Sequence, residues 1–258
     1  MDLELEGKRF LITGGSSGLG RALAARLVAE GAAVALMARE EQRLHETAAQ
    51  LSEQGGDVLA FAGDVRRHGD LERFLAAAVE RWGGVDGLAN NAGELAAGAF
   101  AEHDDEMWEQ DLSLKLMAAV RLTRLALPQL RESGGAVLNT LAISGKAPDA
   151  FTTATSVSRA AGLALTKALS RELAAEGIRV NAVLIGVVES GQLERYAAQA
   201  GITPPEYYER MVRDARIPLG RVGRPREFAD LGAFLLSARA SYVTGVGVNL
   251  DGGLCPLT

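Results

Sequence analysis

The sequence predicts an α/β fold: a Rossmann-type, doubly wound parallel sheet with helices on both faces. Short apolar runs alternate with helical patterns along most of the chain, which is typical of parallel strands joined by helical crossovers. A glycine-rich turn, Thr13–Gly20, follows the first apolar run and opens into the first helical pattern. A strand, such a turn and a helix in this order are typical of a nucleotide-binding sheet.

Hydrophobic periodicity places the individual elements. Strands are expected at residues 9–12, 33–38, 58–62, 85–89, 136–139, 178–183 and 245–250. Helices are expected at residues 21–28, 40–53, 71–82, 104–130, 155–175 and 225–236. The alternation breaks at about 189–218, and we interpret this segment either as a small helical lid over the site or as a surface helical excursion.

Composition narrows the function classes. The 258 residues are 48% hydrophobic and predict a single domain over residues 1–258. A formal net charge of −6 argues against nucleic-acid binding. The single cysteine, Cys255, argues against disulfides and a zinc site, so no metal is expected. Without a membrane-length apolar span, the protein is expected to be cytoplasmic and to act on a small molecule.

The turn Thr13–Gly20 has a physical reason to bind phosphate. Glycine lets the backbone adopt dihedral angles that other residues avoid, and it lets a pyrophosphate approach closely. The N–H groups and the positive dipole end of the following helix then face the anion. A structural turn is the alternative interpretation, and the strand-to-helix context favours nucleotide binding.

Five segments between residues 9 and 253, the glycine-rich turn among them, point to one family. The matching segments are Thr13–Gly20, Asn90–Gly93, Gly177–Val183, Pro218–Pro225, and Val243–Gly245 with Asp251–Gly253. Together they resemble the short-chain dehydrogenase/reductase family, especially its members similar to 3-oxoacyl-carrier-protein reductases. This resemblance implies a bound nicotinamide dinucleotide, and an oxidoreductase that moves a hydride to or from a small carbonyl or alcohol substrate.

The resemblance also assigns cofactor contacts. The pyrophosphate and adenosine ribose would contact Gly14, Ser16, Ser17, Gly18, Leu19 and Gly20, and the adenine would contact Asp64 and Val65. The nicotinamide would lie near Asn90, Ala92 and Gly93, and its ribose would contact Arg159. The carboxamide or the phosphates would contact Gly186, Val188 and Ser190. Arg39 follows the second strand, where an arginine pairs with a 2′-phosphate. NADP(H) is therefore expected, although the nearby Glu40 and Glu41 leave NAD(H) open.

The chain departs from the family at its catalytic positions. Alignment with the family's Tyr-x-x-x-Lys segment puts Thr155 at the tyrosine and Arg159 at the lysine. Ala142 falls at the serine, and Lys115 at the asparagine. A threonine hydroxyl is a much weaker acid than a phenol, and arginine stays charged. The site therefore lacks the usual proton donor for the alkoxide that hydride transfer produces.

Four residues are candidates to complete the site. Lys115 is the first candidate proton donor, because burial beside Arg159 would lower the pKa of its amine. It could instead form a Schiff base with a carbonyl substrate, or lie on the solvated side of its helix. A lid tyrosine, Tyr196 or Tyr207, is the second candidate donor, and Ser144 is a candidate ligand for the substrate oxygen.

Three functions stay open at this point. The first is an NADP(H)-dependent oxidoreductase with a non-standard acid/base site. The alternatives are a catalytically silent NADP(H)-binding or regulatory protein, and a non-redox lyase or isomerase that retains the cofactor. Relatives assemble through two long central helices, and the small-residue run 160–164 would permit close helix approach. A homodimer or homotetramer is therefore expected.

Overall fold

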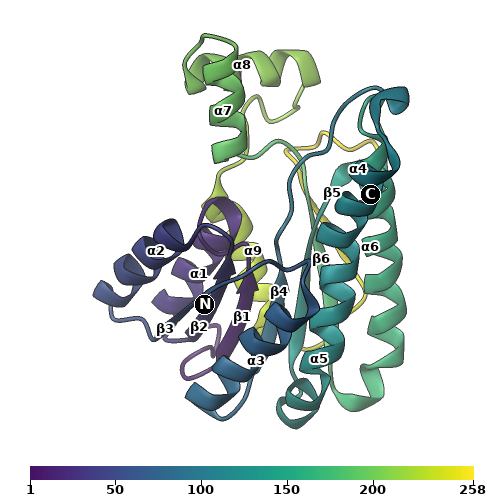
Figure 1. Ribbon diagram of the computed structural model, residues 1–258. Helices are drawn as coiled ribbons and strands as arrows, with labels where there is room; N and C mark the ends of the chain where they lie inside the picture. The colour runs from purple at the N-terminus through teal and green to yellow at the C-terminus, as the bar shows by residue number, and fades with distance from the viewer.

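A computed structural model describes residues 1–258 and confirms the predicted fold class. Seven strands form one sheet, all pairs are parallel, and the order is β3-β2-β1-β4-β5-β6-β7 (Figure 1). The strands are β1 (Arg9–Thr13), β2 (Ala33–Ala38), β3 (Val58–Ala62), β4 (Gly87–Asn90), β5 (Ala136–Ala142), β6 (Arg179–Ile185) and β7 (Gly247–Leu250). Chain order reverses between β1 and β4, where sheets of this kind form a crevice for a ligand.

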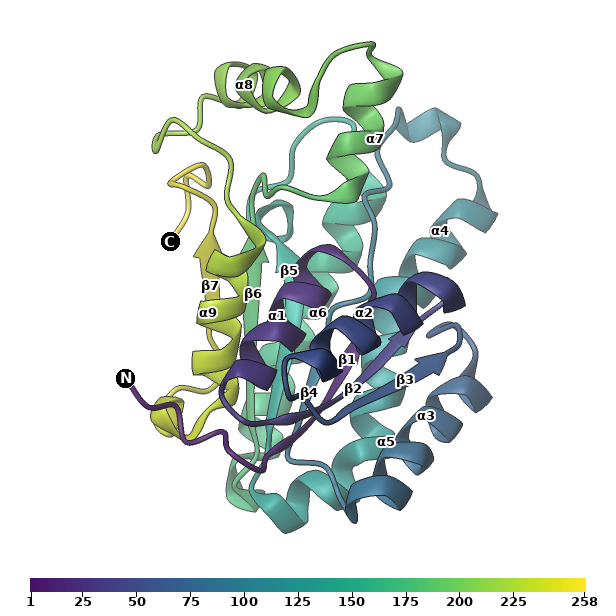
Figure 2. The ribbon, with the colours of Figure 1, turned by 90° about the vertical axis from the view of Figure 1, so that its left-hand side faces the viewer.

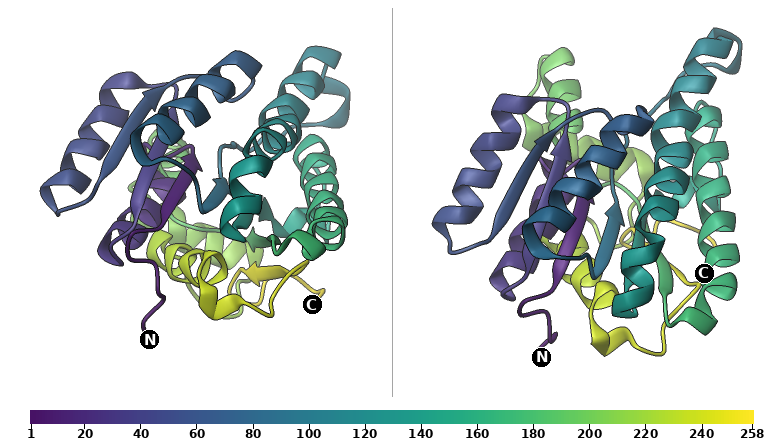
Figure 3. Two further views of the ribbon diagram at one scale, coloured as in Figure 1. Left: turned by 90° about the horizontal axis from the view of Figure 1, so that it is seen from below. Right: turned by 60° about the horizontal axis from the view of Figure 1, so that its bottom comes forward.

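Helices cover both faces of the sheet (Figure 3). They are α1 (Gly18–Ala29), α2 (Glu41–Glu53), α3 (His68–Trp82), α4 (Asp105–Leu112), α5 (Ala118–Ser133), α6 (Thr153–Glu172), α7 (Gly191–Gln199), α8 (Pro204–Ala215) and α9 (Pro225–Leu236). Side chains alternate across β1, so Phe10 and Ile12 join one core and Leu11 joins the other. Helices α1, α2 and α9 pack in the first core, and α3 and α5 pack in the second. Burial on both faces explains why the strands read as continuous apolar runs.

The helix expected over 104–130 differs from the structure in one respect. It divides into α4, a π-helical turn at Ser113–Met117, and α5. Asp104 caps the start of α4, because its side chain accepts a hydrogen bond from the Met107 N–H. The π-helical turn carries Lys115 and directs this lysine into the protein, where its side chain is fully covered. Such turns often mark functional sites.

The segment 189–218 forms two helices above the carboxyl ends of the strands (Figures 1 and 2). Ser190 caps α7, and Thr203 and Glu206 form a capping box at the start of α8, where Pro204 occupies the first turn. Their place over the sheet suits a lid, and that role stays a prediction. No helix of the chain is long and apolar enough to span a bilayer.

The small-residue run in α6 contains a glycine that faces the sheet. Gly162 is buried, and a Cβ atom there would lie 2.7 Å from Cδ2 of Leu141 in β5. The glycine therefore lets α6 approach its own sheet, whereas Ala160 and Ala164 are exposed. Association of two chains through α5 and α6 stays a prediction.

Candidate active site

The turn after β1 is built by close backbone approach. Gly14 has φ +68°, and a Cβ atom on Gly20 would lie 2.2 Å from the Gly14 carbonyl oxygen. No side chain fits in that space, so close packing requires glycine at position 20. The first turn of α1 is thereby pressed against the end of β1.

The N-terminus of α1 is open to an anion. Ser17 occupies the N-cap position in an extended conformation, and its side chain makes no capping hydrogen bond. The first turn holds no acidic residue. Free N–H groups and the positive end of the helix dipole therefore face the crevice, together with Gly18 at φ +51°. These features fit the pyrophosphate contacts expected for Ser16, Ser17, Gly18 and Leu19.

The second predicted cofactor segment, Asn90–Gly93, is tied to the same turn. The Thr13 hydroxyl accepts hydrogen bonds from the backbone N–H groups of Asn91 and Ala92, at 3.0 and 3.1 Å. The Asn91 amide donates to the Thr13 carbonyl at 3.1 Å. Asn90 turns its side chain inward, where its amide donates to Asn139 at 2.9 Å. Only the backbone of Asn90 then remains for a cofactor.

The adenine end of the crevice carries two arginines. Arg39 is exposed and has no hydrogen-bonded or ionic partner, so its guanidinium is free to bind a phosphate. Asp64 pairs with Arg66 at 2.6 Å, and this bond, with the more distant Arg39 charge, holds the pKa of Asp64 below its usual value. Val65 beside it is buried. The Asp64–Arg66 pair was missed by sequence reasoning, although an acid and a base two residues apart could have indicated it.

Three residues that the alignment predicts at catalytic positions converge in space. Lys115 Nζ donates to the Thr155 hydroxyl at 2.8 Å and also to the Asp111 carboxylate. The Lys115 side chain is fully buried, so the solvated alternative is wrong. Burial and the nearby Arg159 charge lower the pKa of Lys115 to about 8, while Asp111 acts in the opposite direction. The prediction of a lysine beside Arg159 with a lowered pKa agrees with this geometry.

Thr155 lies at the centre of this cluster. Besides accepting from Lys115, its hydroxyl accepts from the Ala96 N–H at 2.9 Å and donates to the Ala96 carbonyl at 3.1 Å. The loop after the Asn90–Gly93 turn therefore covers Thr155. Leu95 in the same loop donates to the Gln192 side chain, and Gln192 donates to the Tyr196 hydroxyl at 2.8 Å. The loop thus joins the cluster to α7.

Arg159 joins the cluster to the predicted nicotinamide side. Its Nη1 donates to the Thr140 carbonyl at 2.8 Å, at the end of β5. A Cβ atom on Gly93 would lie 2.6 Å from Nη2, so the guanidinium rests against that glycine. Nε is buried and has no partner. Burial lowers the pKa of Arg159 to about 10, so the guanidinium stays charged at neutral pH.

Asp111 is the functional residue that sequence reasoning missed. Its side chain is 4% exposed and lies four residues before Lys115, on the same side of the helix. One carboxylate oxygen accepts the Lys115 hydrogen bond, and the other is buried without a partner. An acid four residues before a lysine was a usable signal, since this spacing favours ion pairs on helices.

The remaining candidates, Ser144, Tyr207 and Tyr196, make no direct hydrogen bond to Lys115, Thr155 or Arg159. Ser144 is half-buried in the 3₁₀ turn Ile143–Gly145, just beyond β5. Tyr207 lines a hollow of about 570 Å³ between α7 and α8, and no hydrogen bond joins it to Lys115, Thr155 or Arg159. Tyr196 is linked to the loop over Thr155 only through Gln192.

The predicted contacts after β6 lie in the segment between β6 and α7. A Cβ atom on Gly186 would lie 2.7 Å from Cβ of Asp251, so this glycine allows the segments after β6 and β7 to touch. Val188 is buried and forms a bridge to Gly223. The Ser190 hydroxyl accepts from the Leu193 N–H at 3.3 Å. Their predicted contacts with a cofactor stay predictions.

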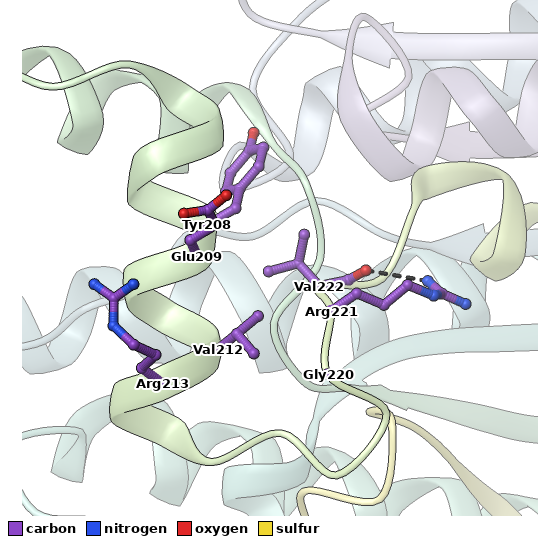
Figure 4. A pocket seen from close by; sticks show the side chains of 7 residues that line it. All are labelled: Tyr208, Glu209, Val212, Arg213, Gly220, Arg221 and Val222. Carbon is purple, nitrogen blue, oxygen red and sulfur yellow. Dashed lines mark hydrogen bonds between the residues drawn. The ribbon is translucent and has the colours of Figure 1, made fainter.

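A separate hollow of about 340 Å³ lies between α8 and residues 220–222 (Figure 4). Tyr208 and Val212 extend from α8 on one side, and Val222 faces them from the other. None of the cluster residues lines it, so it is distinct from the candidate active site. No group of three or more His, Cys, Asp or Glu side chains is placed to hold a metal ion.

Comparison with known proteins supports the assignment to a family of oxidoreductases. A Streptomyces violaceoruber protein named as a ketoacyl reductase of granaticin polyketide synthase is 38% identical over 95% of this chain and 92% of its own length. L-sorbose reductase from Gluconobacter frateurii, solved with NADPH and L-sorbose, is 33% identical, with a TM-score of 0.95 over 100% of both chains.

A third similar protein is of particular interest for the altered site. It is an NADPH-bound short-chain oxidoreductase from Pseudomonas aeruginosa PAO1, described as containing an atypical catalytic center. It is 35% identical, with a TM-score of 0.91 over 97% of this chain and 98% of its own. A family model described as enoyl-(acyl carrier protein) reductase matches residues 14–255. This chain belongs to the short-chain dehydrogenase/reductase family.

Proposed function

We propose that this protein is an NADP(H)-dependent oxidoreductase that interconverts a small carbonyl compound and its alcohol, with Lys115 as the proton donor. One observation carries the proposal: the buried Lys115 amine contacts the Thr155 hydroxyl at 2.8 Å. Thr155 stands at the position of the family's tyrosine, and Lys115 at that of its asparagine. The short side chain leaves room that the long lysine fills from the opposite helix.

NADP(H) fits the residues that line the crevice. The uncapped N-terminus of α1 suits the pyrophosphate, and the unpaired Arg39 suits a 2′-phosphate. Two similar structures contain NADPH, which supports this cofactor over NADH. When bound, the cofactor supplies the hydride that adds to the carbonyl carbon.

The protein's own residues then handle the proton. As the carbonyl oxygen becomes an alkoxide, the Thr155 hydroxyl turns from the Ala96 carbonyl to this oxygen and gives up its proton. Lys115 returns a proton to the Thr155 oxygen across their hydrogen bond, which leaves a neutral amine. Alcohol oxidation follows the same path in reverse, so the neutral amine is then the active form.

Arg159 has a different task in this scheme. Its charge stays fixed, so it cannot exchange protons at neutral pH. Its guanidinium rests against Gly93, and we assign it to hydrogen bonds with the nicotinamide ribose. Burial of the amine and, second to it, the Arg159 charge favour the neutral form of Lys115 and lower its pKa to about 8.

Fluorescence titration with NADPH, followed by turnover on a panel of ketones, aldehydes and alcohols, tests this function. Lys115→Met removes the amine, and Lys115→Arg keeps a positive charge beside Asp111 but cannot release a proton. We expect both variants to lose about 100-fold or more in kcat. Circular dichroism should check folding, since an unpaired buried Asp111 destabilises Lys115→Met by about 3–5 kcal/mol.

Lys167→Met is the matched control, because this exposed lysine lies on α6 away from the cluster. It should retain wild-type turnover. NADPH binding without turnover on the whole panel would support the silent nucleotide-binding alternative. Turnover of a substrate without change in NADPH absorbance would support the lyase or isomerase alternative.

A further inference from the structure

Asp111 has an unusual position for an acidic residue. It lies in the last turn of α4, directly before the π-helical turn that carries Lys115. Its side chain is 4% exposed, and one of its two oxygens is buried without a partner. Such a carboxylate costs free energy unless a nearby cation compensates its charge. The hydrogen bond from Lys115 is its only side-chain contact with a cation.

The charges around the Lys115 amine are few. Asp111 faces it from α4, Arg159 faces it from α6, and Glu94 acts from the loop over Thr155. Glu94 is exposed, so solvent screens its charge. Asp111 is therefore the one buried negative charge beside two buried positive charges, those of Lys115 and Arg159.

We propose that Asp111 is a positioning residue that holds the Lys115 amine against Thr155 and keeps it protonated for carbonyl reduction. This inference rests on the proposed function, because it concerns the same proton donor. The i,i+4 bond fixes the lysine side chain in one direction, and the carboxylate charge opposes the two effects that favour the neutral amine. Without Asp111, burial and Arg159 would act with less opposition, and the pKa of the amine would fall further.

The test is the pH dependence of kcat/KM for carbonyl reduction in Asp111→Asn, measured with saturating NADPH. Asparagine keeps an oxygen that accepts the Lys115 hydrogen bond but removes the charge. The wild-type rate should fall as pH rises through about 8, where Lys115 loses its proton. In Asp111→Asn this fall should begin about one pH unit or more lower, because an opposite charge in contact has been removed.

Glu109→Gln is the matched control, since it removes one carboxylate from an exposed position on the same helix. Its pH profile should overlay that of the wild type. A fall at the wild-type pH in Asp111→Asn would overturn the inference, even if Lys115→Met is inactive. Full activity of Lys115→Met would instead overturn the proposed function.

A second measurement does not depend on turnover. Nuclear magnetic resonance of the protein labelled with ¹³C at the lysine Cε, with Lys115→Arg to assign the signal, reports the pKa of Lys115 in the NADPH complex. A lower pKa in Asp111→Asn than in wild type is expected. Equal values would contradict the inference, whatever the substrate.

Discussion

The turn after β1 and the cluster around Thr155 are both parts of the candidate site, but they are built differently. The turn uses backbone groups and glycines from one continuous stretch, Thr13–Gly20. The cluster uses polar and charged side chains of α4, the π-helical turn and α6, together with the Ala96 backbone of a loop. The hydrogen bond between Lys115 and Thr155 joins residues 40 positions apart in the sequence. Backbone recognition depends on shape, whereas proton transfer depends on side-chain identity. Cofactor binding can therefore persist while the catalytic side chains change.

The largest expected effect lies in the turn. Gly20→Ala places a Cβ atom 2.2 Å from the Gly14 carbonyl oxygen and 2.6 Å from the Asn91 amide, so the turn must shift. We expect NADPH binding to become too weak to measure and the free energy of unfolding to fall by about 1–3 kcal/mol. Isothermal titration calorimetry and urea unfolding measure the two effects.

Gly69→Ala is the control, because a Cβ atom there meets nothing closer than 3.6 Å and the residue is helical. It should leave binding unchanged. If Gly20→Ala bound NADPH normally, the turn would not be the phosphate site.

The next effect tests whether a change in the cluster leaves cofactor binding at the turn unchanged. Thr155→Val keeps the shape of the side chain but removes the hydroxyl that contacts Lys115 and Ala96. Turnover should fall about 100-fold or more, while the dissociation constant of NADPH changes little. Unpaired partners of the lost hydroxyl should reduce the free energy of unfolding by about 1–3 kcal/mol.

Single-turnover absorbance at saturating NADPH separates the chemical step from binding in this variant. A matched loss of NADPH affinity and turnover would show that the cluster also binds the cofactor. The two regions would then act as one unit.

The smallest effect concerns the choice between the two dinucleotides. Arg39→Ala should weaken NADPH binding roughly threefold to tenfold and leave NADH binding unchanged, because only NADPH carries a 2′-phosphate for this exposed arginine. The loss should shrink at high salt, which screens exposed charges. Arg171→Ala, an exposed arginine on α6, is the control. An equal loss for both dinucleotides would assign Arg39 another role.

Some parts of the site were within reach of sequence reasoning and others were not. The turn Thr13–Gly20, the order of the strands and helices, and the alignment of Lys115 and Arg159 with catalytic positions follow from local patterns and from family spacing. The hydrogen bonds between Ala96 and Thr155 and between Leu95 and Gln192 do not follow from such patterns, because they depend on how an irregular loop packs on α6 and α7. The contact of Gly162 with Leu141 was also out of reach, since a small-residue helix face does not say whether it meets a sheet or another chain.

The sequence by itself determined the doubly wound fold, the family and the place of the nucleotide turn, because periodicity and glycine requirements act between neighbouring residues. Only the tertiary structure decided that Lys115 points inward, that Thr155 receives its hydrogen bond, and that Asp111 supplies the opposing charge. These outcomes depend on a π-helical turn and on packing between α4 and α6. Long-range packing sets burial, and burial sets the pKa of the group that we propose as the proton donor.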